Sequence, residues 1–285
     1  MKNNIFIVTG GSQGIGRQTA LGLAKLGVEV VIVSRDMERG LLARQAIIKE
    51  SLNPLVHLET ADLSSLEEIR NLGTRLASRF PLIHGLINNH AALFNAYTLS
   101  PDGIEMTFAL NHLAYFSLTL LLLENIERAA GRVVNVSARV HENIEQDFLD
   151  DLCPAETYNP WTAYCQSKLA NILFTYALAR KIEGSGVTVN CLHPGTAQTL
   201  ALKTAREIYT ALHGPTDFVT PGTLEAAAST SLFLATAPEV DGISGKFFID
   251  CRVVPSSHLS YNESLQEKLW ELSSALVATQ ASKAG

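Results

Sequence analysis

Thr9-Gly10-Gly11-Ser12-Gln13-Gly14-Ile15-Gly16 lies between the apolar run Ile5 to Val8 and a stretch with helical periodicity. Glycines let the backbone turn sharply and come close to a phosphate, and the free N–H groups of the following helix favour negative charge. Thr19 to Leu26 continues the helix, Gly27 ends it, and Val28 to Val33 is a second apolar run. The segment predicts a strand–helix–strand unit that binds a pyrophosphate, although an ordinary strand-to-helix turn is also rich in glycine.

A second informative element lies far downstream, in Tyr164-Cys165-Gln166-Ser167-Lys168. A tyrosine and a lysine four residues apart share one face of a helix, so we expect the ammonium group to favour the ionised form of the phenol. With Thr175 they form a polar stripe on an otherwise apolar helix. An exposed pair without function is the alternative. Together with the glycine-rich segment, the pair indicates nicotinamide-dependent carbonyl chemistry.

Composition limits the function classes. The chain has 285 residues, of which 47% are hydrophobic and 18% charged, so it can bury a large core. Because no linker or repeat divides it, we expect one domain over residues 1–285. The net charge of −6 leaves no basic face for nucleic acid.

The N-terminus enters an apolar run without the pattern of a signal peptide, and Leu113 to Leu123 is shorter than the roughly 20 residues of a membrane span. We therefore expect a cytoplasmic protein without a membrane anchor. The four cysteines have neither paired nor metal-like spacing, so we expect free thiols and no metal site. They are Cys153, Cys165, Cys191 and Cys251.

Apolar runs of strand length recur along the chain, separated by segments long enough for helices. They are Ile5 to Val8, Val28 to Val33, Leu55 to Leu58, Gly85 to Ile87, Arg132 to Val136, Val187 to Leu192 and Lys246 to Ile249. Strands that are apolar on both faces are typical of a parallel sheet covered by helices on both sides. We therefore predict a doubly wound α/β fold with about seven strands.

Ligands of such sheets bind beyond the carboxyl ends of the strands, and polar residues follow several of the predicted strands. These residues are Ser34-Arg35, Asp62-Leu63, Asn88-Asn89, Ser137 and His193-Pro194-Gly195. We expect them to gather along one edge of the sheet, where a cofactor would lie.

The set of motifs resembles the short-chain dehydrogenase/reductase family from the first strand to the last helix, which implies a Rossmann-type sheet. The matching positions are the glycine-rich segment, Asp62, Asn88-Asn89, Asn111, Ser137, Tyr164 with Lys168, and Pro194-Gly195 with Thr199. Asp102-Gly103-Ile104-Glu105, Asn111-His112-Leu113, Val133 to Ser137, Ala163 to Asn171 and Ser244 to Cys251 are similar to the retinol dehydrogenase branch.

The resemblance implies four catalytic residues: Asn111, Ser137, Tyr164 and Lys168. Tyr164 would exchange a proton with the substrate oxygen as a hydride moves to or from the nicotinamide, and Lys168 would bring the phenol pKa of about 10 into a useful range. Ser137 would stabilise charge on the substrate oxygen, although a serine at a strand end is usually a turn residue. Asn111 would hold a relay water, with a capping or core role as the alternative.

Charge at the end of the second strand indicates the cofactor. An acid there would favour NAD, whereas this chain has Ser34 followed by Arg35, which suit the 2′-phosphate of NADP(H). A solvated surface charge is the alternative for Arg35. We expect Asp36 to cap the helix that begins at Met37 rather than to repel the phosphate. NADP(H) is therefore the predicted cofactor, with NAD(H) the less favoured choice.

Further cofactor contacts are implied by the resemblance. Asp62 would accept from the adenine, or would cap the helix near Ser65. The remaining positions are Gly10, Ser12, Gln13, Gly14, Ile15, Gly16, Leu63, Asn89, Pro194, Gly195, Thr196 and Thr199, together with Tyr164 and Lys168. The chain departs from the family at Asn88-Asn89-His90-Ala91, where the family has Asn-Asn-Ala-Gly, and at Ala114, which replaces a glycine. His90 would either touch the cofactor or be a packed, hydrogen-bonded histidine.

The segment from about 200 to 218 is the predicted substrate lid, and a last helix is predicted over about 263–276. Apolar residues in and near the lid indicate a hydrophobic small-molecule substrate, or else they only pack the lid onto the core. They are Trp161, Leu200, Leu202, Ile208, Tyr209, Leu212 and Phe218. The resemblance also implies a homodimer or homotetramer through helices over Thr107 to Leu123 and Ala163 to Ile182.

The predicted function is a soluble carbonyl/alcohol oxidoreductase that prefers NADP(H). A biosynthetic ketoreductase acting on a polyketide-like or terpenoid intermediate is the rival within enzymes. A non-catalytic NADP(H)-binding sensor or scaffold is the rival from another class, which the presence of Ser137, Tyr164 and Lys168 disfavours.

Overall fold

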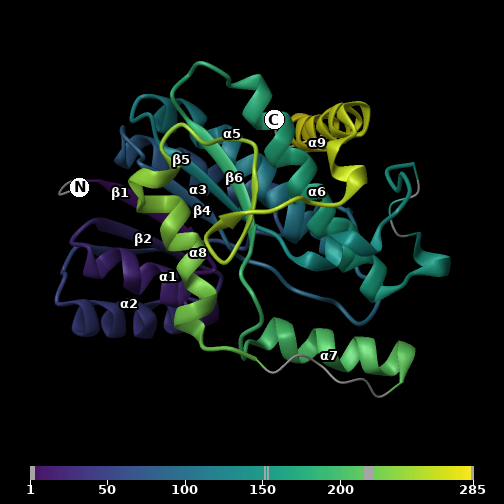
Figure 1. Ribbon diagram of the computed structural model, residues 1–285, viewed down its shortest axis with the longest axis horizontal. Coiled ribbons are helices and arrows are strands. Elements are labelled where there is room, and N and C mark those ends of the chain that lie inside the picture. Colours follow the sequence, from purple (N-terminus) through teal and green to yellow (C-terminus); the bar gives the residue numbers. More distant parts are fainter. Residues whose placement is uncertain (1–3, 151, 153, 215–220, 284–285) are drawn as a thin grey trace.

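A single mixed sheet runs through the protein, with strand order β3-β2-β1-β4-β5-β6-β7-β8 (Figure 1). This computed structural model describes residues 4–150, 152, 154–214 and 221–283. The strands are β1 (Ile5–Thr9), β2 (Glu29–Ser34), β3 (Val56–Thr60), β4 (Gly85–Asn88), β5 (Arg132–Val136), β6 (Thr188–His193), β7 (Phe247–Ile249) and β8 (Arg252–Val253).

All neighbouring strands are parallel except β7 and β8, so the predicted doubly wound fold and its seven strands are confirmed. The antiparallel strand β8 was missed. Asp250 and Cys251 turn the chain between β7 and β8, both with positive φ (49° and 60°). A strand of two residues after such a turn is too short to show periodicity.

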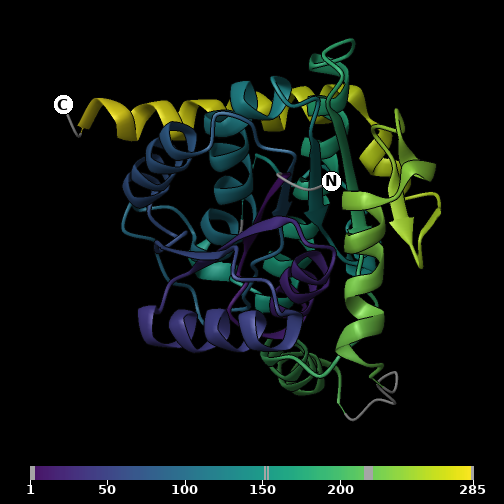
Figure 2. The same ribbon diagram turned by 90° about the vertical axis from the view of Figure 1, so that its left-hand side faces the viewer.

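Helices cover both faces of the sheet. They are α1 (Gly14–Lys25), α2 (Met37–Ser51), α3 (Leu66–Arg79), α4 (Met106–Phe108), α5 (Ala114–Glu127), α6 (Pro160–Lys181), α7 (Leu200–His213), α8 (Leu224–Thr236) and α9 (Glu263–Lys283). One apolar cluster joins α1, α2 and α8 to the sheet, and another joins α3, α5 and α6 to its other face. In Figure 2, α2 and α9 lie on opposite sides of the molecule.

Short polar side chains cap most of the long helices. Asp36 caps α2, as predicted, by accepting from the Arg39 N–H. Ser65 caps α3, so the alternative that Asp62 is this cap is wrong. In contrast, α1 has no side-chain cap at its start. The helix that follows the glycine-rich segment therefore keeps N–H groups available for an anion.

The apolar run around Leu113 to Leu123 belongs to a longer helix. Among the described residues, the continuous stretch Met106–Glu127 is long and apolar enough to cross a membrane, and 72% of its apolar window is buried inside the molecule. The expectation that the helix is too short was wrong, because α4, a π-helical turn η1 (Ala109–Leu113) and α5 join without a break. Its burial in the core is confirmed.

The last helix, α9, packs across α6 and also contacts α3. Trp270 of α9 contacts the rings of Phe116 and Phe174, with centroid distances of 5.1 and 6.0 Å. Nearly every residue of α6 from Ala163 to Leu178 is buried within one chain. Part of this burial comes from α9, whereas α5 packs mainly against α3. A homo-oligomer stays a prediction.

Replacing Trp270 by alanine should lower the free energy of unfolding by about 2 kcal/mol, less than a fully buried tryptophan because Trp270 is only partly buried. Urea denaturation would measure the change, with Glu271→Ala on the exposed side of the same helix as the control. Equal stabilities of the two variants would contradict the packing role of α9.

Candidate functional site

Loops from four parts of the chain converge at the carboxyl edge of the sheet. A Cβ atom on Gly10 would lie 3.0 Å from the Cα of His90, and one on Gly14 would lie 3.4 Å from the Thr199 methyl group. The Ser34 hydroxyl lies 3.0 Å from that of Ser12. The structure thus brings together the predicted residues that follow β1, β2, β4 and β6.

The glycine-rich segment fits a dinucleotide. Gly14 has a φ of +55°, which few other residues adopt. At Gly16 a Cβ atom would lie 2.4 Å from both the Asn89 Nδ2 and the Gly10 carbonyl oxygen, so only glycine fits there. Asn89 Nδ2 also donates to the Thr9 carbonyl (3.0 Å). This tight turn leads into the uncapped start of α1, as a pyrophosphate site requires.

Two arginines follow the end of β2, namely Arg35 directly after the strand and Arg39 in the first turn of α2. The Ser34 hydroxyl is buried and donates to the Asp36 carbonyl (2.8 Å), whereas Arg35 is exposed beside it. Arg39, one turn further along α2, reaches back so that its Nη1 donates to Gln13 Oε1 (3.4 Å). Arg39 was not among the predicted cofactor residues. Its position four residues after Arg35 could have indicated that it lies near the same site.

Two other predicted cofactor positions also have structural roles. One carboxylate oxygen of Asp62 accepts from the N–H and hydroxyl of Ser64 (2.9 and 2.8 Å), and the neighbouring Leu63 is buried. Thr199 caps α7 by accepting from the Leu202 N–H (3.1 Å). Within the loop after β6, the Thr196 carbonyl accepts from the Gly222 N–H (2.7 Å) and Gly195 has a φ of +76°.

Tyr164 and Lys168 lie together on α6 at this edge. Lys168 is 1% exposed, its Nζ donates to the Val136 carbonyl at the end of β5 (3.1 Å), and it lies 5.5 Å from the centre of the Tyr164 ring. α6 begins at Pro160 because Asn159 caps the Trp161 and Thr162 N–H groups. A buried amine beside a phenol is an arrangement that can move protons.

Burial dominates the electrostatics of this pair. Loss of water lowers the pKa of Lys168 to about 7 and raises the pKa of Tyr164 above its usual range, although the Tyr164 ring is partly exposed. Desolvation is the largest cause of the upward shift in the Tyr164 pKa, and a lowering of that pKa by Lys168 stays a prediction. At neutral pH the Tyr164 phenol keeps its proton, and Lys168 is close to half protonated because the pH is near its pKa.

The Ser137 hydroxyl has a partner within the protein in this structure. Its side chain is 2% exposed, and its hydroxyl donates to the Lys168 carbonyl (2.7 Å). The hydroxyl hydrogen that we expected to stabilise a substrate oxygen is used to hold α6 against β5. Ala138, the next residue, offers no hydroxyl group.

Both polar atoms of the Asn111 side chain have protein partners. Its Oδ1 accepts from the Ala92 N–H (2.9 Å), and its Nδ2 donates to the Ala92 carbonyl (2.9 Å) and to the Ser167 hydroxyl (3.1 Å). Its side chain joins the loop after β4 to α6, beside Lys168. The geometry matches the core-satisfying alternative more closely than a role in holding a relay water.

The substitution at His90 is explained by packing. Its Nε2 lies 2.8 Å from the Leu110 carbonyl, which only accepts, so Nε2 carries the proton and Nδ1 accepts from the Thr9 hydroxyl (2.9 Å). The alternative that His90 is a packed, hydrogen-bonded histidine is therefore confirmed. Tyr115 was not among the predicted site residues. Its hydroxyl donates to the His90 carbonyl (2.8 Å), and Lys168 Nζ lies 5.9 Å from its ring.

Apolar side chains gather around Tyr164. Leu93, Ala205 and Ile208 form a buried cluster against which Trp161 and Tyr164 pack, so α7 does lie against the candidate site. Tyr209 contacts the Trp161 ring at 5.0 Å, whereas Leu200 and Leu212 are exposed. The part of the predicted lid from 215 to 218, with Phe218, lies outside the described residues.

A separate hollow of about 660 Å³ lies near the end of β7 and β8. Arg139, Glu142, Asp250 and Arg252 contribute to its lining. These charges do not match an apolar substrate, so the cluster around Tyr164 is the better candidate for the substrate side.

The buried histidines should make the protein sensitive to acid. Burial lowers the pKa of His90 and of His112 from 6.5 to about 3. The unfolded chain therefore binds protons below pH 6.5 that the folded chain does not, and stability is lost as the pH falls. Between pH 7 and 5 each histidine should cost about 2 kcal/mol. Urea denaturation at several pH values should show a smaller loss for His90→Gln than for the exposed control His213→Gln, and equal losses would contradict the burial argument.

Comparison with known proteins gives the family. A family model described as short chain dehydrogenase matches residues 4–148. Retinol dehydrogenase 13 of Mus musculus is 39% identical over 281 residues, covering 95% of this chain and 83% of that protein. Polyprenol dehydrogenase of Homo sapiens is 36% identical over 281 residues, covering 95% and 84%.

Solved structures agree with this. An uncharacterized protein from Mycobacterium paratuberculosis matches with a TM-score of 0.78 and 28% identity, over 97% of this chain and 94% of that chain. The family implies a nicotinamide cofactor, which the glycine-rich segment and α1 fit. The chain belongs to the short chain dehydrogenase family, on its retinol dehydrogenase-like branch, and is a carbonyl/alcohol oxidoreductase.

Proposed function

We propose that this protein interconverts a carbonyl and an alcohol on a hydrophobic small molecule, prefers NADP(H), and uses Tyr164 as the acid/base group. The observation that carries the proposal is the pair formed on α6 by Tyr164 and the buried Lys168, which lies at the carboxyl end of β5 and next to the apolar cluster under α7. The uncapped start of α1 follows the carboxyl end of β1 at the same edge of the sheet. Cofactor and substrate would therefore meet at the phenol.

In the reducing direction the two groups would have separate roles. The bound nicotinamide supplies the hydride. Tyr164, whose raised pKa keeps it protonated at neutral pH, gives its proton to the carbonyl oxygen, and the product is an alcohol. Lys168, with a pKa of about 7, stabilises the phenolate that remains and returns a proton to it. In the alcohol-oxidising direction the same groups take up these protons.

The NADP(H) preference rests on positive charge at the end of β2. Arg35 is exposed there, and Arg39 reaches toward Gln13 of the glycine-rich segment. Two guanidinium groups beside a ribose would attract a 2′-phosphate, and no carboxylate takes the place of Ser34. Asp36, the nearest acid, uses its carboxylate on the start of α2.

The substrate class rests on the apolar side chains around Tyr164 and on the names of the relatives. Retinol and polyprenol are both apolar alcohols built from isoprene units, and Leu93, Ile208 and Trp161 offer the surface that such a chain needs. The biosynthetic ketoreductase alternative uses the same chemistry and differs only in substrate. A cytoplasmic location stays a prediction.

One observation favours a second candidate function. Because the Ser137 hydroxyl donates to the Lys168 carbonyl, the site has one polar group fewer for a substrate oxygen than we expected. A non-catalytic NADP(H)-binding protein would keep the same cofactor residues. NADPH binding without turnover of any carbonyl would favour this candidate.

The Tyr164→Phe variant should lose turnover of NADPH with a panel of apolar aldehydes and ketones but keep NADPH affinity, because only the proton donor is removed. Steady-state absorbance and NADPH fluorescence would measure the two properties. Tyr209→Phe, in the same aromatic cluster, is the control. Turnover by Tyr164→Phe at the wild-type rate would reject the role of this phenol.

Replacing Arg35 by alanine should weaken NADPH binding by on the order of tenfold and leave NADH binding nearly unchanged, since only NADPH carries the 2′-phosphate. Calorimetric titration with each dinucleotide would measure the ratio. Arg128→Ala, an exposed arginine at the end of α5, is the control. Equal losses for NADPH and NADH would contradict the proposed preference.

A further inference from the structure

The π-helical turn η1 (Ala109–Leu113) interrupts the regular hydrogen bonds of a helix and frees backbone carbonyls inside the core. Side chains from outside the turn donate hydrogen bonds to these carbonyls. His90 Nε2 donates to the Leu110 carbonyl (2.8 Å), and Asn171 Nδ2 of α6 donates to the Asn111 carbonyl (3.0 Å). The shape of this turn thus depends on residues that are distant in sequence.

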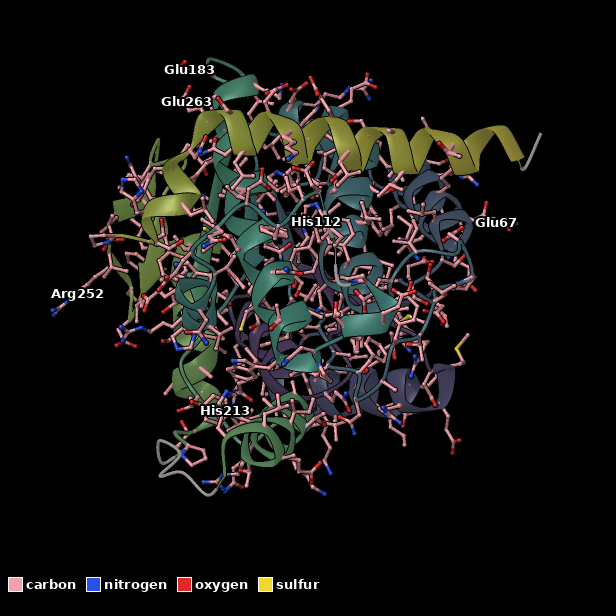
Figure 3. The ribbon with its side chains drawn as sticks, turned by 90° about the vertical axis from the view of Figure 1, so that its right-hand side faces the viewer. Glu67, His112, Glu183, His213, Arg252 and Glu263 are labelled. Atoms are coloured by element: carbon pink, nitrogen blue, oxygen red, sulfur yellow. The ribbon has the colours of Figure 1, made fainter. Side chains whose placement is uncertain are left out.

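A chain of hydrogen bonds continues from Asn171 to the last helix. His112 Nδ1 lies 3.4 Å from Asn171 Oδ1, and His112 Nε2 lies 2.9 Å from the Ser273 hydroxyl of α9. Asn171 Oδ1 only accepts, so His112 carries its proton on Nδ1 and Ser273 donates to Nε2. Asn171, His112 and Ser273 are each 0% exposed. Figure 3 shows His112 beneath α9.

The other end of this chain reaches the candidate catalytic helix. Asn111, whose carbonyl ends the chain, uses its side chain to hold Ala92 and the Ser167 hydroxyl. Ser167 in turn donates to the Tyr164 carbonyl (2.8 Å) and precedes Lys168. A continuous, fully buried path therefore connects α9 to the turn of α6 that carries the Tyr164 and Lys168 pair.

We propose that Ser273, His112 and Asn171 are positioning residues, which hold the π-helical turn so that Asn111 keeps α6 and the loop after β4 in register. This inference rests on the proposed function, because its effect is on the Tyr164 and Lys168 pair. The C-terminal helix thereby becomes part of the active-site scaffold. Buried networks of this kind specify a single geometry because every member is satisfied.

The test replaces one hydroxyl. Ser273→Ala removes the donor to His112, while Ser274→Ala makes the same change one residue further along α9, at a less buried position. We expect Ser273→Ala to lower kcat by on the order of tenfold, with the KM for NADPH within about twofold, because misplaced groups lose rate rather than cofactor affinity. Ser274→Ala should match the wild type. A wild-type kcat for Ser273→Ala overturns the proposal.

A second measurement does not depend on activity. Amide hydrogen exchange of the peptide covering residues 109–113 should become about five to ten times faster in Ser273→Ala and stay unchanged in Ser274→Ala. Faster exchange with an unchanged kcat also overturns the proposal, since the chain would then be only structural. If the wild type shows no turnover, the proposed function fails. Separately, an unchanged rate of amide hydrogen exchange in Ser273→Ala overturns the hydrogen-bonded path.

Discussion

Removal of Lys168 from water is the constraint around which the candidate site is organised. The amine is held by the Val136 carbonyl at the end of β5, between the rings of Tyr115 and Tyr164. A buried amine favours its neutral form, so its pKa falls to about 7 while the pKa of the Tyr164 phenol rises. At neutral pH the phenol thus keeps its proton, and a protonated Lys168 can return a proton to the phenolate once the phenol has given its own to a substrate.

Such a placement requires that α6 cannot slide along the sheet, and polar contacts in the core prevent this. Asn88 of β4 donates to Asn135 of β5 (2.9 Å), which donates to the Thr175 hydroxyl of α6 (3.0 Å). The Ser137 hydroxyl adds a contact to the Lys168 carbonyl. These bonds cross an otherwise apolar layer, where an unpaired polar group would be costly, and they favour one register of helix on sheet.

The amino-acid sequence predicted the parallel sheet because its strands are apolar on both faces, and it predicted which loops meet because carboxyl ends of parallel strands share one edge. It could not predict side-chain direction. Ser137 and Asn111 have the residue types of catalytic groups, yet their hydrogen bonds are used within the protein. The roles of His90 and Ser273 depend on a π-helical turn, and the cover that α9 provides depends on tertiary packing, neither of which has a local sequence signal.

A crystal structure of the protein with NADPH tests the central claim most directly. We expect the pyrophosphate at the start of α1, beside Gly14 and Gly16, and the nicotinamide ring next to the Tyr164 hydroxyl with the Lys168 amine on the same side. A dinucleotide bound elsewhere on the sheet, or a Tyr164 oxygen turned away from the nicotinamide ring, would contradict it.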